Sequence, residues 1–131
     1  MARRAMCNGF ATLLANSALA LVATVALAEP SVRLVVQSSL LAGFRYHAAE
    51  ELWGELRIGD RLTLERERDN PHDANAVSVA WRGHKLGYVP RRENALLAWS
   101  LDRGERLRAR ISRLRPHPNP ARRLEFEVYI E

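Results

Sequence analysis

Two segments whose large apolar residues recur at every second position place the strongest constraint on the fold of this chain. They are residues 77–81 (Val-Ser-Val-Ala-Trp) and residues 124–130 (Leu-Glu-Phe-Glu-Val-Tyr-Ile). Successive side chains of a β-strand point to opposite faces of a sheet, so a period of two predicts strands with one face in the core. The sequence therefore predicts a protein that is mainly β.

Four further segments complete the predicted sheet, and one or two short helices accompany it. The helices are predicted at 48–56 and at 91–103, where Gly104 marks the end. Beyond residue 111 the alternation changes phase, which predicts a bulge near Ser112–Arg113. Six strands around short helices favour a small, strongly bent sheet or barrel. The four remaining strands are expected at 32–41, 61–68, 85–89 and 106–111.

The first thirty residues are typical of a secretory signal peptide. Arg3 and Arg4 precede an apolar run at 10–28, which ends in small residues before Glu29-Pro30. We expect cleavage after Ala28, and therefore an exported protein that is periplasmic or secreted and has no membrane span. An uncleaved anchor is the alternative, since the run approaches the ~20 residues that a spanning helix needs.

Loss of residues 1–28 from the 131 leaves 103, which suits one domain at 29–131. Cys7 lies in the removed segment, so the remainder has no cysteine and relies on packing instead of disulfides. Thiolate zinc sites and cysteine nucleophiles are thereby excluded. The remainder has 18 basic and 15 acidic residues, a net charge of +3. We expect a monomer.

A basic run at 103–123 contains eight arginines and one acidic residue, Glu105. Alternating arginines on one face of a strand suit phosphate binding, because guanidinium donors match phosphate oxygens. The alternative is that Glu125 and Glu127 pair with these arginines across neighbouring strands. The run alone does not decide between the two interpretations.

The loop at 65–77, Glu-Arg-Glu-Arg-Asp-Asn-Pro-His-Asp-Ala-Asn-Ala-Val, separates two predicted strands. Asn70, Asp73 and Asn75 are residues that hydrogen-bond nearby backbone, and Pro71 restricts the backbone of its neighbour. One interpretation is a turn that satisfies its own polar groups. The other is a rigid loop that presents these side chains to a ligand.

Residues 41–131 resemble the HIRAN domain, found in Swi/Snf-type helicase-like repair proteins and as a standalone bacterial module. Three blocks carry the resemblance: Ala-Gly-Phe-Arg-Tyr-His at 42–47, Leu-Glu-Arg-Glu at 64–67 running into Asn-Pro-His-Asp-Ala-Asn-Ala-Val at 70–77, and Leu-Gly-Tyr-Val-Pro-Arg at 86–91. The resemblance implies a small six-stranded β-barrel related to the OB fold. It also implies a nucleic-acid-binding module that recognises the 3′ end of single-stranded DNA in a basic, aromatic-lined groove.

The resemblance also implies roles for individual residues. Arg45 would contact phosphate, Tyr46 would stack on a base, and Asp73 would accept a hydrogen bond from the terminal 3′-hydroxyl. Alternatively, Tyr46 is a core or rim aromatic and Asp73 only holds the loop. Family members commonly carry an aromatic where this chain has His47 and His72, rings that stack less strongly and gain charge below a pKa of about 6.5. The full predicted nucleic-acid-binding set is Arg45, Tyr46, His47, Asn70, His72, Asp73, Tyr88 and Arg91.

We expect no catalysis, no cofactor and no metal. The chain has no P-loop and no cysteine pairs, and His47, His72 and Asp73 match no metal-ligand spacing. Two alternatives to nucleic-acid binding remain. The first is an exported module that binds a protein or an envelope polymer through the same groove. The second is a metal-dependent hydrolase of phosphate esters or anhydrides built on Asp69, His72 and Asp73.

Overall fold

The computed structural model describes residues 20–26 and 32–131. The main unit spans Ser31–Glu131 and contains six strands, two α-helices and three single turns of 3-10 helix. The strands are β1 (Leu34–Leu40), β2 (Arg61–Arg66), β3 (Val77–Trp81), β4 (His84–Tyr88), β5 (Arg108–Leu114) and β6 (Leu124–Ile130). The helices are η1 (Phe44–Tyr46), α1 (Ala49–Leu52), η2 (Arg91–Glu93), α2 (Ala95–Asp102) and η3 (Pro120–Arg122).

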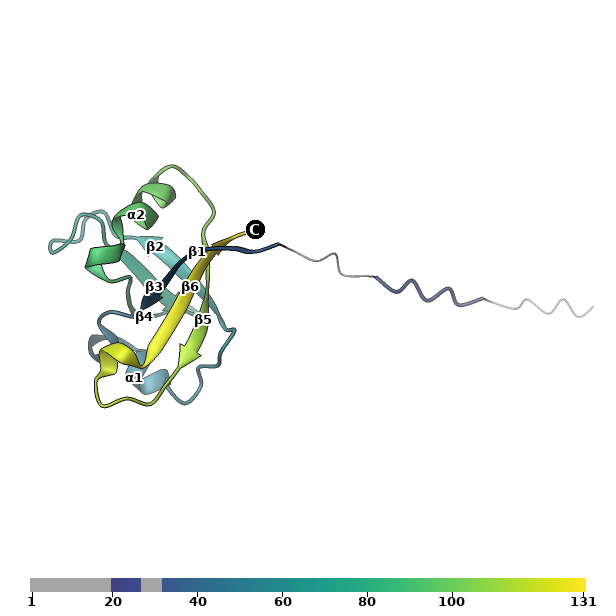
Figure 1. Ribbon diagram of the computed structural model, residues 1–131, viewed down its shortest axis with the longest axis horizontal. Helices are drawn as coiled ribbons and strands as arrows, with labels where there is room; N and C mark the ends of the chain where they lie inside the picture. Colours follow the sequence, from purple (N-terminus) through teal and green to yellow (C-terminus); the bar gives the residue numbers. More distant parts are fainter. Residues whose placement is uncertain (1–19, 27–31) are drawn as a thin grey trace, which may run out of the picture. The chain divides into compact units, whose positions relative to one another are not determined.

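The six strands form one antiparallel sheet in the order β1-β6-β5-β2-β3-β4. The two edges of the sheet meet just after β1, where Ala42 and Tyr88 exchange two backbone hydrogen bonds of 2.9 Å. In Figure 1, α2 and α1 lie at opposite ends of the bent sheet. The predicted six-stranded, mainly β architecture is confirmed, and we call the Ala42–Tyr88 contact the seam.

The core fills the inside of this bent sheet with the apolar side chains of the alternating segments. Val77, Val79 and Trp81 point inward from β3, and Leu124, Phe126 and Val128 do so from β6. Phe44 of η1 and Leu97 of α2 close the ends of the same core. The period-two pattern thus identifies the core-facing residues of β3 and β6, although Ser78 on the other face of β3 is buried as well.

Gly87 allows the seam to close. A Cβ at this position would collide with the carbonyl oxygen of Ala42 and lie 3.1 Å from the Leu41 side chain. Only a residue without a side chain lets the two backbones approach closely enough to pair here.

Two predicted helices are shorter than expected. The segment 91–103 divides at Asn94 into the 3-10 turn η2 and the helix α2, whose first backbone hydrogen bond runs from the Ala98 N–H to the Asn94 carbonyl. The Asn94 side chain is buried and donates to Asp73. The segment 48–56 forms helix only over Ala49–Leu52. The predicted bulge is confirmed, since the β5–β6 register shifts between Ile111 and Arg113.

The N-terminal unit spans Met1–Pro30, and of it the structure describes residues 20–26, which are exposed and have no regular secondary structure. Most of the predicted signal peptide at 1–28, with its cleavage site after Ala28, lies outside the described residues and stays a prediction. Within residues 20–26 and 32–131, no helix is long and apolar enough to cross a membrane.

Candidate nucleic-acid interface

Seven of the eight predicted binding residues line one groove of about 600 Å³. They come from η1, from the loop at 67–76, from the end of β4 and from η2, with Ala42, Ala76 and Val89 as apolar lining between them. The seam brings η1 and β4 together, so the groove exists only because the sheet closes there. We call it the seam groove, and the seven residues are Tyr46, His47, Asn70, His72, Asp73, Tyr88 and Arg91.

Arg45 is the one predicted residue that does not line the seam groove. Its side chain is exposed and borders a smaller hollow of about 260 Å³ together with Tyr46 and residues 119–121. Because Tyr46 borders both hollows, Arg45 lies beside the seam groove.

Tyr46 presents an exposed ring at the rim of the groove. Gly43 adopts a left-handed backbone with φ 74° and begins η1, and the Tyr46 N–H closes that turn on the Gly43 carbonyl at 3.0 Å. The Tyr46 side chain is 82% exposed. A core role for Tyr46 is therefore wrong, and a rim position is correct.

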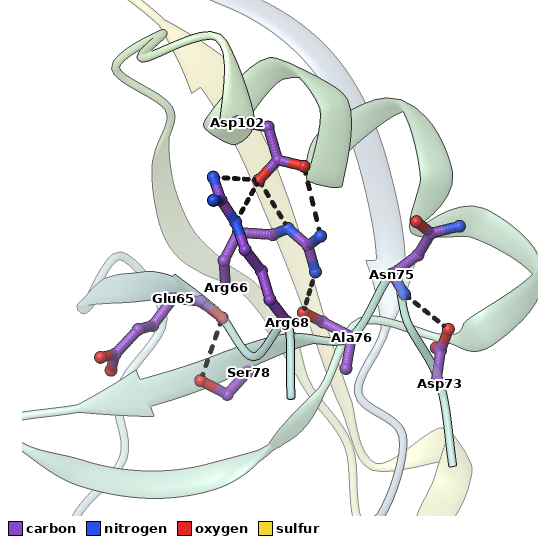
Figure 2. Close-up of polar contacts among 8 residues, drawn as sticks. All are labelled: Glu65, Arg66, Arg68, Asp73, Asn75, Ala76, Ser78 and Asp102. Carbon is purple, nitrogen blue, oxygen red and sulfur yellow. Dashed lines mark hydrogen bonds and ion pairs between the residues drawn. The ribbon is translucent and has the colours of Figure 1, made fainter. Parts of the chain in front are cut away.

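The loop at 67–76 holds its shape through its own polar side chains. Asn70 accepts from the His72 backbone N–H, and Asp73 accepts from the Asn75 backbone N–H, each at 2.9 Å. The prediction that Asn70 and Asp73 satisfy nearby backbone is confirmed, whereas Asn75 participates through its backbone N–H (Figure 2). The loop is a self-satisfied turn and also a wall of the groove.

Asp73 also attaches the loop to the start of α2. Its second oxygen accepts a 2.6 Å hydrogen bond from the amide of Asn94, a buried residue. Sequence reasoning missed Asn94, because the two residues are 21 positions apart and nothing local marks their contact.

A second attachment joins the base of the loop to the end of α2. Arg66 and Arg68 converge on the Asp102 carboxylate at 2.9 and 3.0 Å, and Arg66 also donates to the Ala76 carbonyl (Figure 2). The hydrogen bonds from Arg66, together with those from Arg68, lower the pKa of Asp102. The loop is thus held at both ends of one helix, which keeps its side chains in place.

A charged pair supports the far wall of the groove. Lys85 donates to Glu67 at 2.6 Å, and the Tyr88 hydroxyl donates to the same carboxylate at 2.9 Å. Burial raises the pKa of Glu67, but hydrogen bonds from Lys85, Tyr88 and Asn70 outweigh it and hold that pKa below its usual value. The hydrogen bond to Glu67 raises the pKa of Lys85. Both groups are therefore charged at neutral pH, and together they fix the Tyr88 side chain.

His47 packs edge-on against Tyr88, with ring centroids 5.4 Å apart. Burial and the nearby positive charge of Lys85 lower the pKa of His47. The ring is therefore neutral near pH 7. His72, in contrast, is exposed at the loop.

The arginines of β5 face the acidic residues of β6. Arg110 contacts Glu127 at 3.0 Å and Arg108 contacts Glu131 at 3.3 Å. The predicted cross-strand pairing with Glu127 is therefore correct for Arg110, whereas Arg108 pairs with Glu131, which follows β6 and was not among the predicted partners. Beyond the bulge, Arg113 and Arg115 lie outside these pairs.

Within the part of the chain that the structure describes, no three His, Cys, Asp or Glu side chains gather in an arrangement that could hold a metal ion.

Comparison with known proteins gives one family and two solved structures. The model of the HIRAN domain matches residues 34–131. A crystal structure of a protein from Lactobacillus plantarum is 30% identical, with a TM-score of 0.65 over 75% of this chain and 94% of that one. The crystal structure of the HIRAN domain of human HLTF is 18% identical, with a TM-score of 0.54 over 74% of each chain, and supports the fold. No protein with a curated description matches the chain.

Proposed function

The chain belongs to the HIRAN domain family, and from that premise we propose that it is a nucleic-acid-binding module whose seam groove takes the 3′ end of single-stranded DNA. One observation supports the proposal above the others: an exposed tyrosine ring, a carboxylate and an arginine, far apart in sequence, line the same groove. Single-strand binding requires a stacking surface and a cation for the phosphate. An end-binding site requires in addition a group that recognises the end.

Tyr46 supplies the stacking surface. Its ring is exposed at the rim, and the apolar lining from Ala42, Ala76 and Val89 lies in the same groove. A base on such a ring gains about 1–3 kcal/mol. His47 is neutral and already packed against Tyr88, so it completes the wall instead of carrying charge.

Arg91 in the groove and Arg45 beside it supply the phosphate contacts. Both side chains are exposed, and within residues 32–131 neither forms an ion pair. Arginine donates several N–H groups in one plane, which matches the oxygens of a phosphate. The charged pair Lys85–Glu67 adds no net charge to the wall.

Asp73 supplies the group that reads the end. Each of its oxygens already accepts one hydrogen bond, from Asn75 and from Asn94, which fixes the direction of the carboxylate. An ionised carboxylate has about four acceptor positions, so the remaining ones accept a hydrogen bond from a 3′-hydroxyl. A 3′-phosphate would place negative charge against Asp73 and is disfavoured.

The stacking role is tested with Tyr46→Ala in the full chain. We expect the dissociation constant for a single strand with a free 3′-hydroxyl to rise about 5- to 150-fold, as the loss of one stacked base predicts. Fluorescence anisotropy at several salt concentrations measures it.

Trp99→Ala is the matched control. Trp99 is an aromatic ring on α2 that is 52% exposed and lines none of the hollows described above. Its removal should leave the affinity unchanged. The proposal would be contradicted if Tyr46→Ala and Trp99→Ala lost the same amount of affinity for the strand. It would also be contradicted if the unaltered chain bound no nucleic acid. Either result would favour a protein or envelope-polymer ligand.

A further inference from the structure

A second groove, of about 650 Å³, adjoins the seam groove. Ala42 lines both grooves, and the segment after β4 is shared between them, with Arg91 on the seam groove and Pro90 and Glu93 on the second. Three arginines enter it: Arg113 and Arg115 from the end of β5, and Arg122 from η3. We call it the arginine groove.

The three arginines differ from those earlier on β5. Arg110 is paired with Glu127 of β6 and Arg108 with Glu131 just after it, whereas among the residues that the structure describes Arg113, Arg115 and Arg122 form no ion pair. All three are exposed. The bulge between Ile111 and Arg113 shifts the register at this point and separates the two sets.

Two carboxylates also line the arginine groove. Glu93 accepts a 2.7 Å hydrogen bond from the Ser39 hydroxyl, which directs it toward β1. Glu125 lies opposite Arg113 in the sheet register. Three cations against two anions leave a net positive groove, which suits a polyanion better than a cation.

The grooves are connected through a third hollow. Tyr46 lines the seam groove and the hollow of Arg45, and Ala121 lines the hollow of Arg45 and the arginine groove. Arg45 therefore lies between the stacking tyrosine and Arg122. Each of the three hollows thus contains at least one arginine: Arg91 in the seam groove, Arg45 in the small hollow, and Arg122 in the arginine groove.

We propose that the arginine groove is a second phosphate-binding site, and that it holds internal phosphates of the strand whose 3′ end occupies the seam groove. This inference rests on the proposed function. The strand passes Tyr46, contacts Arg45, and continues to Arg122, Arg115 and Arg113. Counterion release from these phosphates makes the binding of a longer strand more dependent on salt than that of a short one.

The test compares strands of about three and about ten nucleotides with the same free 3′ end, the first shorter than the roughly 4–16 nucleotides that an OB fold covers and the second within that range. The unaltered chain should bind the longer strand more tightly. In the variant R113Q/R115Q/R122Q this advantage should disappear, while affinity for the short strand stays within about twofold. The salt slope for the longer strand should fall by up to about 2, at ~0.7 for each phosphate that is no longer neutralised.

The matched control is R61Q/R82Q/R106Q, which removes the same charge. These three arginines line neither groove, and within residues 32–131 they form no ion pair. The control should keep the length advantage. An unaltered chain that binds short and long strands equally would overturn this inference but leave the proposed function intact. If the two triple variants lost the affinity advantage of the longer strand to the same extent, this inference would also be overturned. If the unaltered chain bound neither strand, both proposals would be overturned.

Discussion

At the scale of single residues, the groove depends on side chains whose charge is set by their neighbours. Asp73 is oriented by Asn75 and Asn94, and Glu67 is held ionised by Lys85 and Tyr88. His47 lines the same groove, and burial together with the nearby charge of Lys85 lowers its pKa. The sequence suggested a ring that gains charge below a pKa of about 6.5, whereas in the folded chain burial and the positive charge of Lys85 oppose that charge.

The state of His47 has a consequence for pH. Its folded-state pKa lies below the usual 6.5, so between these two values the unfolded chain binds more protons than the folded chain. Its contribution to stability is therefore fully present above about pH 6.5 and falls as the pH drops toward the folded-state pKa. The substitution His47→Phe should remove the contribution of His47 to the pH dependence of the free energy of unfolding.

An NMR titration of the His47 ring measures the pKa directly, with the chain in concentrated urea as the reference. The midpoint in the folded protein should lie below the midpoint in urea. A folded-state midpoint equal to or above the urea value would contradict the packing of His47 described above.

At the scale of elements, the seam and α2 position the site. The seam joins the segment after β1 to β4, which brings η1 against the end of β4. The two ends of α2 hold the loop at 67–76 through Asn94–Asp73 and through Asp102 with Arg66 and Arg68. The groove is therefore lined by elements that are each fixed to the barrel, an arrangement that favours a preformed binding site.

Gly87→Ala tests the seam. The added Cβ would meet the Ala42 carbonyl, so either the two hydrogen bonds of the seam break or the edge strands move apart. We expect the free energy of unfolding to fall by about 1–3 kcal/mol, the usual cost of overpacking, measured by urea denaturation. Affinity for single-stranded DNA should fall as well, because the groove spans the seam.

Gly54→Ala is the control for the seam, since no atom lies within 4 Å of a Cβ added there. It should change the stability by less than about 1 kcal/mol. A Gly87→Ala variant as stable as Gly54→Ala would show that the seam is not needed for the fold.

At the scale of the whole molecule, features with local causes were predictable from the sequence. The strands at 77–81 and 124–130 follow from strict alternation, and the bulge after Ile111 follows from its loss of phase. The three motif blocks anticipated the seven residues that meet in the seam groove. Local pattern and motif thus determine the sheet and the main members of the site.

Contacts between distant segments were not predictable in this way. The hydrogen bond of Asn94 to Asp73 joins residues 21 positions apart, and the contact of Arg66 with Asp102 joins residues 36 positions apart. The pairing of Arg110 with Glu127 was one of two interpretations of the basic run, and the strand order decides in its favour. No local periodicity encodes the two contacts with α2, because the residues that meet lie far apart in the chain.

The most direct test of the central proposal, that the seam groove binds a 3′ end, compares two strands that differ only in a 3′-hydroxyl or a 3′-phosphate. We expect the hydroxyl strand to bind about 10- to 150-fold more tightly, as a hydrogen bond of about 1.5–3 kcal/mol to a charged acceptor predicts. Asp73→Asn should remove most of this preference. Asp69 is an exposed carboxylate of the same loop that does not line the groove. The control variant Asp69→Asn should therefore keep the preference for the hydroxyl strand. Equal dissociation constants for the two strands with the unaltered chain would contradict the proposal.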